Sequence, residues 1–321
     1  FSLLFYFLLN NYGVISLVYS LLISNFIILG FIIILQFKNT HFVFNKKFVK
    51  DALKISIPNT PRSLFGQINA KADKILISAL SSFSNTGIYT IAQSLSYVVF
   101  QITTSLDKVF ITRTNQMLFK KENTKIGPYL SPFIYICSLP AIAMFLFHDL
   151  ILKIFIDEKY YGSENVIIIL TLYYFTLTFG KIASTQLIYA KKVWLNSNFF
   201  IMNIILNIIL NIPLIYFFEI IGAAIATLAS SSISLMFSMK YAKKNAYISL
   251  EKKLIYLCFS FIFISSFYSI LITNKIINIY YLYDQILSLL IIITYLVLGF
   301  KYNLYNINTL KNIFSFTQYK K

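Results

Sequence analysis

Residues 53–99 read LKISIPNTPRSLFGQINAKADKILISALSSFSNTGIYTIAQSLSYVV. The run is mostly apolar and belongs to two helical segments, 51–80 and 86–111, each long enough for the roughly 20 residues that a membrane span needs. At a helical period of 3.6 residues the first segment gathers its polar residues on one face: Asn59, Arg62, Gly66, Asn69 and Asp73. Arg62 and Asp73 lie about 16 Å apart along the axis, so they cannot pair with each other. Each must therefore meet water, substrate or another helix.

Two further segments carry polar faces. In 86–111 the face consists of Thr86, Thr90, Gln93, Tyr97, Gln101, Thr104 and Lys108, with Asp107 beside it. In 163–190 it consists of Tyr174, Thr178, Lys181 and Thr185. A charge inside a bilayer costs about 2.5 to 3.5 kcal/mol on insertion scales, so such positions are informative.

These faces predict a shared hydrated cavity, cationic at Arg62, Lys108 and Lys181, which would suit an anionic ligand such as a phosphate. The candidate substrate-binding residues are Asn59, Arg62, Asn69, Asp73, Gln93, Gln101, Lys108, Tyr174 and Lys181. A plainer interpretation applies to Lys71, Lys74 and Lys108, which lie near segment ends and can extend their ammonium groups to the membrane surface.

The composition supports a membrane protein. The 321 residues are 58% hydrophobic and 12% charged, with a mean hydropathy of +0.73, whereas a soluble domain carries about 25% charged residues. This excludes a soluble enzyme, a disordered protein and a secreted disulfide scaffold. The net charge of +17 would suggest nucleic acid binding in a soluble protein. Here the basic residues separate apolar segments, so no nucleic acid partner is predicted.

Nine full spans and one partial span are predicted: 1–9 (partial), 12–36, 51–80, 86–111, 128–150, 163–190, 193–217, 220–241, 252–273 and 279–300. Lysine-rich connections alternate with connections of low or mixed charge. Because basic loops face the cytoplasm, we expect a multi-pass protein of the cytoplasmic membrane with a cytoplasmic C-terminus. The chain opens inside an apolar run, so we expect the C-terminal portion of a longer protein.

The sequence carries no enzyme motif, and neither catalysis nor a cofactor is predicted. Cys137 and Cys258 lie inside apolar runs and are interpreted as small core residues. His41 and His148 are isolated, so no metal site is expected. Polar amides recur at four-residue spacing at Asn203, Asn207 and Asn211, a pattern that favours hydrogen bonds between helices. A small face on the following helix, Gly222, Ala223, Ala226 and Ala229, suits close packing.

Three stretches together resemble Wzx-type polysaccharide flippases of the multidrug/oligosaccharidyl-lipid/polysaccharide (MOP) exporter superfamily. The first is 53–99, with Asp-Lys-Ile-Leu at 73–76 and Gly-Ile-Tyr-Thr at 87–90. The second is 159–170, KYYGSENVIIIL. The third is 203–230, with Asn-Ile-Pro followed by Ile-Gly-Ala-Ala-Ile-Ala-Thr. The specificity lies in the order of these motifs, since each is diffuse.

The resemblance implies an all-α, MATE-like bundle of two lobes. Residues 1–36 would be the last two helices of the first lobe, 37–50 a cytoplasmic linker, 51–244 the second six-helix lobe, 245–300 two additional helices and 301–321 a basic tail. The implied function is to flip undecaprenyl-diphosphate-linked oligosaccharide repeat units by alternating access, for O-antigen, capsule or exopolysaccharide synthesis. The implied partners are this substrate, membrane lipids, a polysaccharide polymerase and a chain-length regulator.

Two alternatives remain open from the sequence. A MATE-like exporter of drugs or metabolites should line its lumen with acidic residues, whereas the candidates here are mostly basic. A membrane polysaccharide polymerase or glycosyltransferase should display a large outer loop, and the longest expected here is 148–162.

Overall fold

The computed structural model describes residues 2–13, 15–39, 45–120, 122–245, 248, 250–277 and 280–302. Within these ranges the side chains of 37–39, 51, 52, 54–65, 67, 68, 70, 123 and 124 fall outside the description. The expected basic tail therefore lies almost wholly outside the described residues. The described part contains α-helices, one short 3-10 helix and no strand, so the predicted all-α fold is confirmed.

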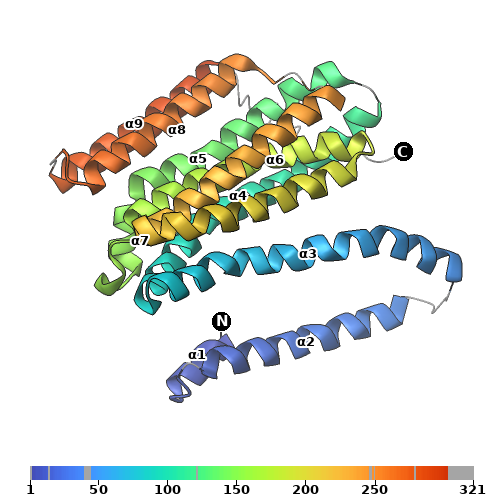
Figure 1. The fold of residues 1–321 in the computed structure, drawn as a ribbon, viewed down its shortest axis with the longest axis horizontal. Helices are drawn as coiled ribbons and strands as arrows, with labels where there is room; N and C mark the ends of the chain where they lie inside the picture. The colour runs from blue at the N-terminus through green and yellow to red at the C-terminus, as the bar shows by residue number, and fades with distance from the viewer. Residues whose placement is uncertain are drawn as a thin grey trace. The chain divides into compact units, whose positions relative to one another are not determined.

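The helices in Figure 1 follow the predicted segments closely. Their bounds are α1 Ser2–Leu9, α2 Ile15–Asn39, α3 Lys46–Leu80, α4 Phe83–Phe119, α5 Asn123–Phe155, η1 Glu158–Tyr160, α6 Glu164–Tyr189, α7 Val193–Asn245, α8 Lys252–Thr273 and α9 Tyr281–Lys301. The bounds of α8 are those predicted. By contrast, α2 ends at Asn39 and α3 begins at Lys46, so both helices extend into the expected linker 37–50.

The chain divides into two units, Phe1–Asn59 and Thr60–Lys321. In the first unit α1 and α2 pack against each other. Aromatic contacts join them, since the Phe7 ring lies 5.5 Å from that of Tyr12 and 5.9 Å from that of Tyr19. The second unit holds the rest of α3 and helices α4 to α9. The lobe boundaries implied by the resemblance stay a prediction.

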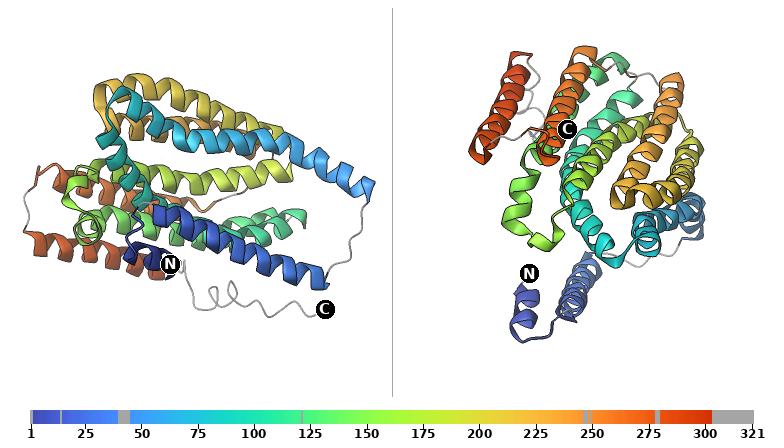
Figure 2. Two further views of the ribbon diagram at one scale, coloured as in Figure 1. Left: turned by 90° about the horizontal axis from the view of Figure 1, so that it is seen from below. Right: turned by 60° about the vertical axis from the view of Figure 1, so that its left-hand side comes forward.

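In the second unit, α4 packs on α5 and α6, α6 packs extensively on α7, and α8 and α9 lie against α5. Figure 2 shows the same helices from two further directions. A buried hydrogen bond from the Ser96 hydroxyl to the Ile167 carbonyl, 3.1 Å long, ties α4 to α6. On the other side, the Tyr135 and Tyr295 rings stack at 4.5 Å and attach α9 to α5. The core therefore centres on α5 and α6.

Helix α7 is interrupted at Glu219, where φ is 49° and ψ is −127°. We call residues 193–218 its first arm and 220–245 its second arm, which correspond to the two spans predicted there. The arms approach closely at Gly222, because a Cβ added there would lie 1.9 Å from the Leu214 carbonyl oxygen. Only glycine fits such a contact, so the close packing expected from the small face is confirmed.

The connections between the helices of the second unit lie at its two opposite ends. The Ser82 hydroxyl accepts from the Asn85 backbone N–H at 3.1 Å and caps α4, while the Asn85 amide donates to Glu219 at 2.9 Å. These bonds place the α3–α4 connection beside the α7 break, at what we call the low-lysine end. Lys191 and Lys192 in the α6–α7 connection and Lys252 at the start of α8 lie at the opposite, lysine-rich end.

Six helices of the described chain are long and apolar enough to cross a membrane: α2, α5, α6, α7, α8 and α9. At 53 residues, α7 is about 80 Å of helix, so it is long enough for two crossings, one on each side of its break. The chain is thus a multi-pass membrane protein. Helices α3 and α4 fall short of the apolar criterion because of the polar residues that the sequence analysis singled out, and their assignment as spans stays a prediction.

Candidate functional site

A buried carboxylate lies where α3, α4 and both arms of α7 meet. Asp73 is only 5% exposed. Its oxygens accept hydrogen bonds from the Tyr89 hydroxyl at 3.1 Å, the Asn211 amide at 2.8 Å and the Thr227 hydroxyl at 3.1 Å. The polar face predicted for α3 therefore meets other helices at Asp73, which is one of the three partners (water, substrate or another helix) expected from its distance to Arg62.

The amide ladder of α7 completes this group. The Asn211 amide also donates to the Asn207 carbonyl oxygen at 3.0 Å, and the Asn207 amide donates to the Thr227 hydroxyl at 3.2 Å. The interhelical role predicted for Asn207 and Asn211 is confirmed. We call Asp73, Tyr89, Asn207, Asn211 and Thr227 the Asp73 cluster.

The donors in the Asp73 cluster are all neutral. Among the described residues, no lysine or arginine forms an ion pair with Asp73. Burial disfavours an uncompensated negative charge, so a proton or a small cation would stabilise this site. The acceptor atoms of this site are oxygens, and hard cations prefer oxygen ligands. One of them, the buried Asn211 carbonyl oxygen, has no donor in the described chain.

A pocket of about 540 Å³ opens between α3, α4, α6 and the two arms of α7. We call it the α6–α7 pocket. Seven hydroxyl side chains line it: Tyr173, Thr176, Ser184, Thr185, Ser231, Ser234 and Ser238. Three amides join them: Asn69, Asn196 and Asn203. Such a lining offers hydrogen bonds in many directions with little charge.

One ion pair crosses the α6–α7 pocket. The Lys181 ammonium on α6 lies 3.9 Å from the Asp107 carboxylate on α4. The same ammonium donates to the Thr104 hydroxyl at 2.9 Å and lies 5.0 Å from the centre of the Phe100 ring. Lys181 is therefore held mainly by Thr104 and Phe100, since 3.9 Å is too long for a hydrogen bond to Asp107.

The α6–α7 pocket adjoins the Asp73 cluster. Asn69 lines the pocket and precedes Asp73 by four residues on α3. Asn203 lines the pocket and precedes Asn207 by four residues on the first arm of α7. Four residues are about one helical turn, so two helices carry polar side chains continuously from the pocket to the buried carboxylate.

The structure distributes the sequence-predicted residues unevenly. Asn69 and Lys181 line the pocket, and Asp73 lies in the adjoining cluster. Gln93 is half-buried and interacts with the hydroxyl of the buried Tyr174. The remaining four do not join them: Gln101 and Lys108 are exposed on α4, and the side chains of Asn59 and Arg62 lie outside the described residues.

Several residues of the pocket and of the Asp73 cluster are not among the candidates predicted from the sequence. Asp107 was noted only as a neighbour of the α4 face, yet it is the partner of Lys181. On the second arm of α7, Thr227, Ser231, Ser234 and Ser238 recur at spacings of four, three and four residues. That helical periodicity is a signal that could have identified this side of the pocket.

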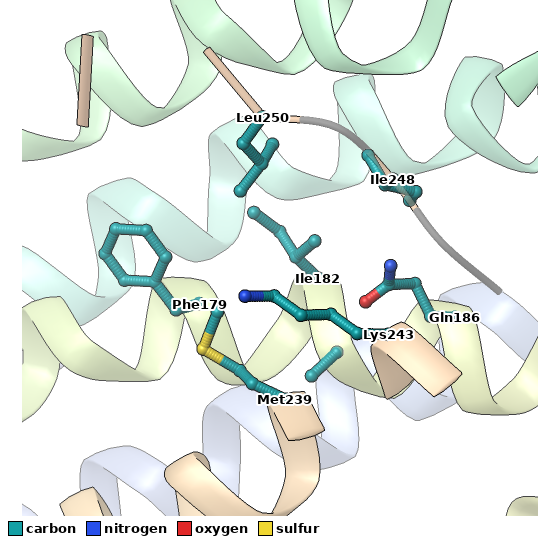
Figure 3. A pocket seen from close by; sticks show the side chains of 8 residues that line it. Phe179, Ile182, Gln186, Met239, Lys243, Ile248 and Leu250 are labelled. Atoms are coloured by element: carbon teal, nitrogen blue, oxygen red, sulfur yellow. The ribbon is translucent and has the colours of Figure 1, made fainter. Parts of the chain in front are cut away.

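A second, smaller pocket lies on a different face of α6 at the lysine-rich end. Figure 3 shows the Lys243 side chain extending across it between Ile182 and Met239. Its volume of about 20 Å³ is room for about one water molecule. It is too small for an organic ligand, so the candidate site is the α6–α7 pocket with the Asp73 cluster.

Comparison with known proteins places the fold. Residues 2–156, just under half of the chain, match a family profile described as "Polysaccharide biosynthesis protein". The structure is similar to one described as "Lipid II flippase MurJ, inward closed conformation", with a TM-score of 0.64 and 17% identity over 92% of this chain and 64% of that one. The chain thus spans less than two thirds of that protein's length.

A second solved structure is described as "Outward-facing conformation of a multidrug resistance MATE family transporter of the MOP superfamily". The TM-score is 0.49 and the identity 18%, over 68% of this chain and 52% of that chain. No curated protein sequence matches significantly. The chain therefore has a MurJ-like, all-α fold, which agrees with the fold that the sequence resemblance implies.

Proposed function

We propose that the intact protein flips lipid-linked oligosaccharides across the cytoplasmic membrane during synthesis of a surface polysaccharide. The observation that carries the proposal is the MurJ-like fold over 92% of the chain. The match of residues 2–156 to a polysaccharide biosynthesis family adds to it. The substrate would be an undecaprenyl-diphosphate-linked repeat unit of an O-antigen, capsule or exopolysaccharide, moved by alternating access without covalent chemistry.

The charges of the described chain suit this substrate class and topology. We assign the lysine-rich end to the cytoplasm, where basic connections are retained. Arg62 and Lys108 are proposed to meet the diphosphate of the substrate, because guanidinium and ammonium groups bind phosphate. A polysaccharide polymerase and a chain-length regulator are the proposed partners that take over the flipped unit.

The Asp73 cluster is proposed to drive the change between the two states. Ionisable residues inside a membrane protein mark functional sites by default, and this carboxylate links three helices through neutral donors. Gaining or losing a positive charge there would change those hydrogen bonds and so the packing of α3, α4 and α7. The cluster would bias alternating access while the pocket one turn away holds substrate.

The test uses the intact gene, deleted in its own host and restored on a plasmid. Lipid-linked oligosaccharides are labelled in spheroplasts with a membrane-impermeant lectin, which detects those on the outer face. The deletion should accumulate complete repeat units on the inner face, and the plasmid should restore outer labelling. Lys181→Ala and Asp73→Ala should fail to restore it, whereas Lys159→Ala, at an exposed lysine of the low-lysine end, should succeed.

Other results would redirect the assignment. Repeat units that reach the outer face in the deletion strain but stay unpolymerised would identify a polymerase. Normal labelling combined with new drug sensitivity would identify an exporter of drugs or metabolites. Either result would refute the flippase proposal.

A further inference from the structure

We propose that the α6–α7 pocket binds the uncharged, hydroxyl-bearing sugar portion of the substrate and excludes its diphosphate. The inference rests on the proposed function and deepens it, because it names the chemical group that this pocket accepts. It also divides the work within the protein: the diphosphate would have to be met by cations outside this pocket.

The pocket is close to neutral. Among the described residues, its charged lining residues are Lys181 and Asp107, one of each sign. The rest of the polar lining consists of hydroxyl and amide groups, which carry no charge. A diphosphate needs several cations or many convergent N–H donors, and the pocket supplies a single ammonium that already faces a carboxylate.

The pocket also contains hydrogen-bond acceptors without donors. The side-chain carbonyl oxygens of Asn69 and Asn203 are buried and have no donor within the described chain. Buried polar atoms are nearly always satisfied in native proteins, so these two amide oxygens call for a ligand that brings donors. The partly exposed Asp107 carboxylate is a further acceptor at this pocket, because its ion-pair partner among the described residues, the Lys181 ammonium, lies 3.9 Å away, beyond hydrogen-bond distance.

A sugar meets this need and a phosphate does not. Each sugar hydroxyl both donates and accepts, as a serine hydroxyl does. It can donate to Asn69, Asn203 and Asp107 while it accepts from the Lys181 ammonium or from the serine hydroxyls. An ionised phosphate only accepts, so it would set its oxygens against three acceptor groups. The imbalance between acceptors and donors thus selects hydroxyl-rich, uncharged ligands.

The size and the apolar parts of the pocket agree with this ligand. Its volume of about 540 Å³ lies within the range of about 300 to 1,000 Å³ typical of small-molecule sites. Phe199, Leu235 and Gly180 add apolar surface between the polar groups, which suits the C–H faces of sugar rings. Residues of both α7 arms line the pocket, so a bound sugar would contact the helix on each side of the α7 break.

The binding test uses the intact protein in lipid nanodiscs with defined probes. Methyl β-glucoside, methyl N-acetyl-β-glucosaminide and inorganic pyrophosphate are titrated separately and measured by saturation-transfer NMR. At least one glycoside should bind in the millimolar range. Asn203→Leu should weaken that binding about tenfold, the equivalent of one lost hydrogen-bonded group. Asn198→Leu is the matched control, because Asn198 is an exposed amide on the same arm and should bind as the wild type does.

A second measurement does not depend on losing a bond. Ser231→Cys places a thiol in the pocket, and Asn198→Cys places one on the exposed face. Modification of each thiol by a methanethiosulfonate is followed by mass spectrometry. The binding glycoside should slow modification at position 231 about threefold or more, as expected when the probe occupies most of the sites, and leave position 198 unchanged.

Three results would overturn the inference. The first is pyrophosphate binding tighter than that of every glycoside. The second is glycoside binding that Asn203→Leu leaves unchanged. The third is the absence of glycoside binding and of protection at position 231. If Asn203→Leu nevertheless restores outer labelling in the deletion host, the flippase proposal stands while the sugar pocket fails, so the two can be told apart.

Discussion

Two polar cavities of the second unit differ in how their side chains are satisfied. The α8–α9 cavity, about 380 Å³ between α5, α6, α8 and α9, is backed by His148 and Asp284. Asp284 accepts from the Tyr268 hydroxyl at 2.7 Å, and a His148 ring nitrogen lies 2.9 Å from a backbone carbonyl. In the α6–α7 pocket, Asn69 and Asn203 keep carbonyl oxygens without donors in the described chain. Unmet hydrogen-bonding capacity, more than volume, distinguishes the candidate site.

The largest expected effect removes the α6–α7 pocket from this comparison. Gly222→Ala would place a methyl group 1.9 Å from the Leu214 carbonyl oxygen, and backbone cannot give way as a flexible side chain does. We expect a loss of about 3 kcal/mol or more in the free energy of unfolding, with the two arms of α7 displaced and the α6–α7 pocket lost. Thermal unfolding of the purified protein measures this.

Gly30→Ala is the matched control for that substitution. Nothing lies within 4 Å of a Cβ added at Gly30, so its melting temperature should stay the same or rise. If Gly222→Ala melted like the wild type, the close approach of the two arms would be refuted.

Next in size is Asp73→Ala. It removes the acceptor of the buried Tyr89 hydroxyl, whereas Asn211 and Thr227 keep the Asn207 and Ala223 oxygens as acceptors. A buried polar group left unsatisfied costs about 1 to 3 kcal/mol. We expect a lower melting temperature together with loss of outer labelling by the lectin. Asp157→Ala, at an exposed carboxylate, should change neither. Wild-type labelling by Asp73→Ala would show that the cluster only holds helices together.

The helices of this protein were predictable because they follow from length and apolar content. The bounds of α8 and the paired spans around Glu219 match, since a long apolar run in a membrane protein has little choice but a helix. The interhelical bonds of Asn207 and Asn211 were predictable for a related reason. A buried amide in an apolar helix must find a partner, even where the sequence does not name it.

The membership of the pocket was predictable only in part: Asn69 and Lys181 were candidates, whereas Asp107 and the serines of α7 were not. A period of 3.6 residues defines a helix face but not what the face meets. Thr104 and Lys108 share the predicted face of α4, yet Thr104 contacts Lys181 and Lys108 is exposed. The pairing of Lys181 with Asp107 joins residues 74 positions apart in the chain, and it depends on how α4 and α6 rotate against each other.

A smaller effect is expected in the α8–α9 cavity, the other member of the comparison. Tyr268→Phe removes only the hydroxyl that donates to Asp284, so we expect about 1 kcal/mol of destabilisation and unchanged outer labelling. Tyr256→Phe is the matched control, because Tyr256 is 72% exposed on the same helix and should have no effect on either readout. Impaired labelling by Tyr268→Phe would mean that the α8–α9 cavity takes part in transport.

The smallest effect concerns stability in the α6–α7 pocket itself. The Asn203 carbonyl oxygen has no donor to lose, so Asn203→Leu should change the free energy of unfolding by no more than about 0.5 kcal/mol, or raise it. The sign is opposite to that expected for Asp73→Ala, and chemical denaturation measures both. A loss well above 1 kcal/mol would show that Asn203 is already satisfied and would remove the contrast between the cavities.

The break at Glu219 has a consequence for biogenesis. A connection of one non-helical residue leaves no loop in which the first arm of α7 could wait for the second. If the first arm left the translocon alone, the Asn207 amide would lack the Thr227 hydroxyl to which it donates and would face acyl chains, where unpaired polar groups are strongly disfavoured. Thr227, the acceptor of the Asn207 amide, is synthesised only after the chain has turned back. The two arms must therefore enter the bilayer as a single hairpin, and a ribosome paused between them would hold the insertion machinery occupied.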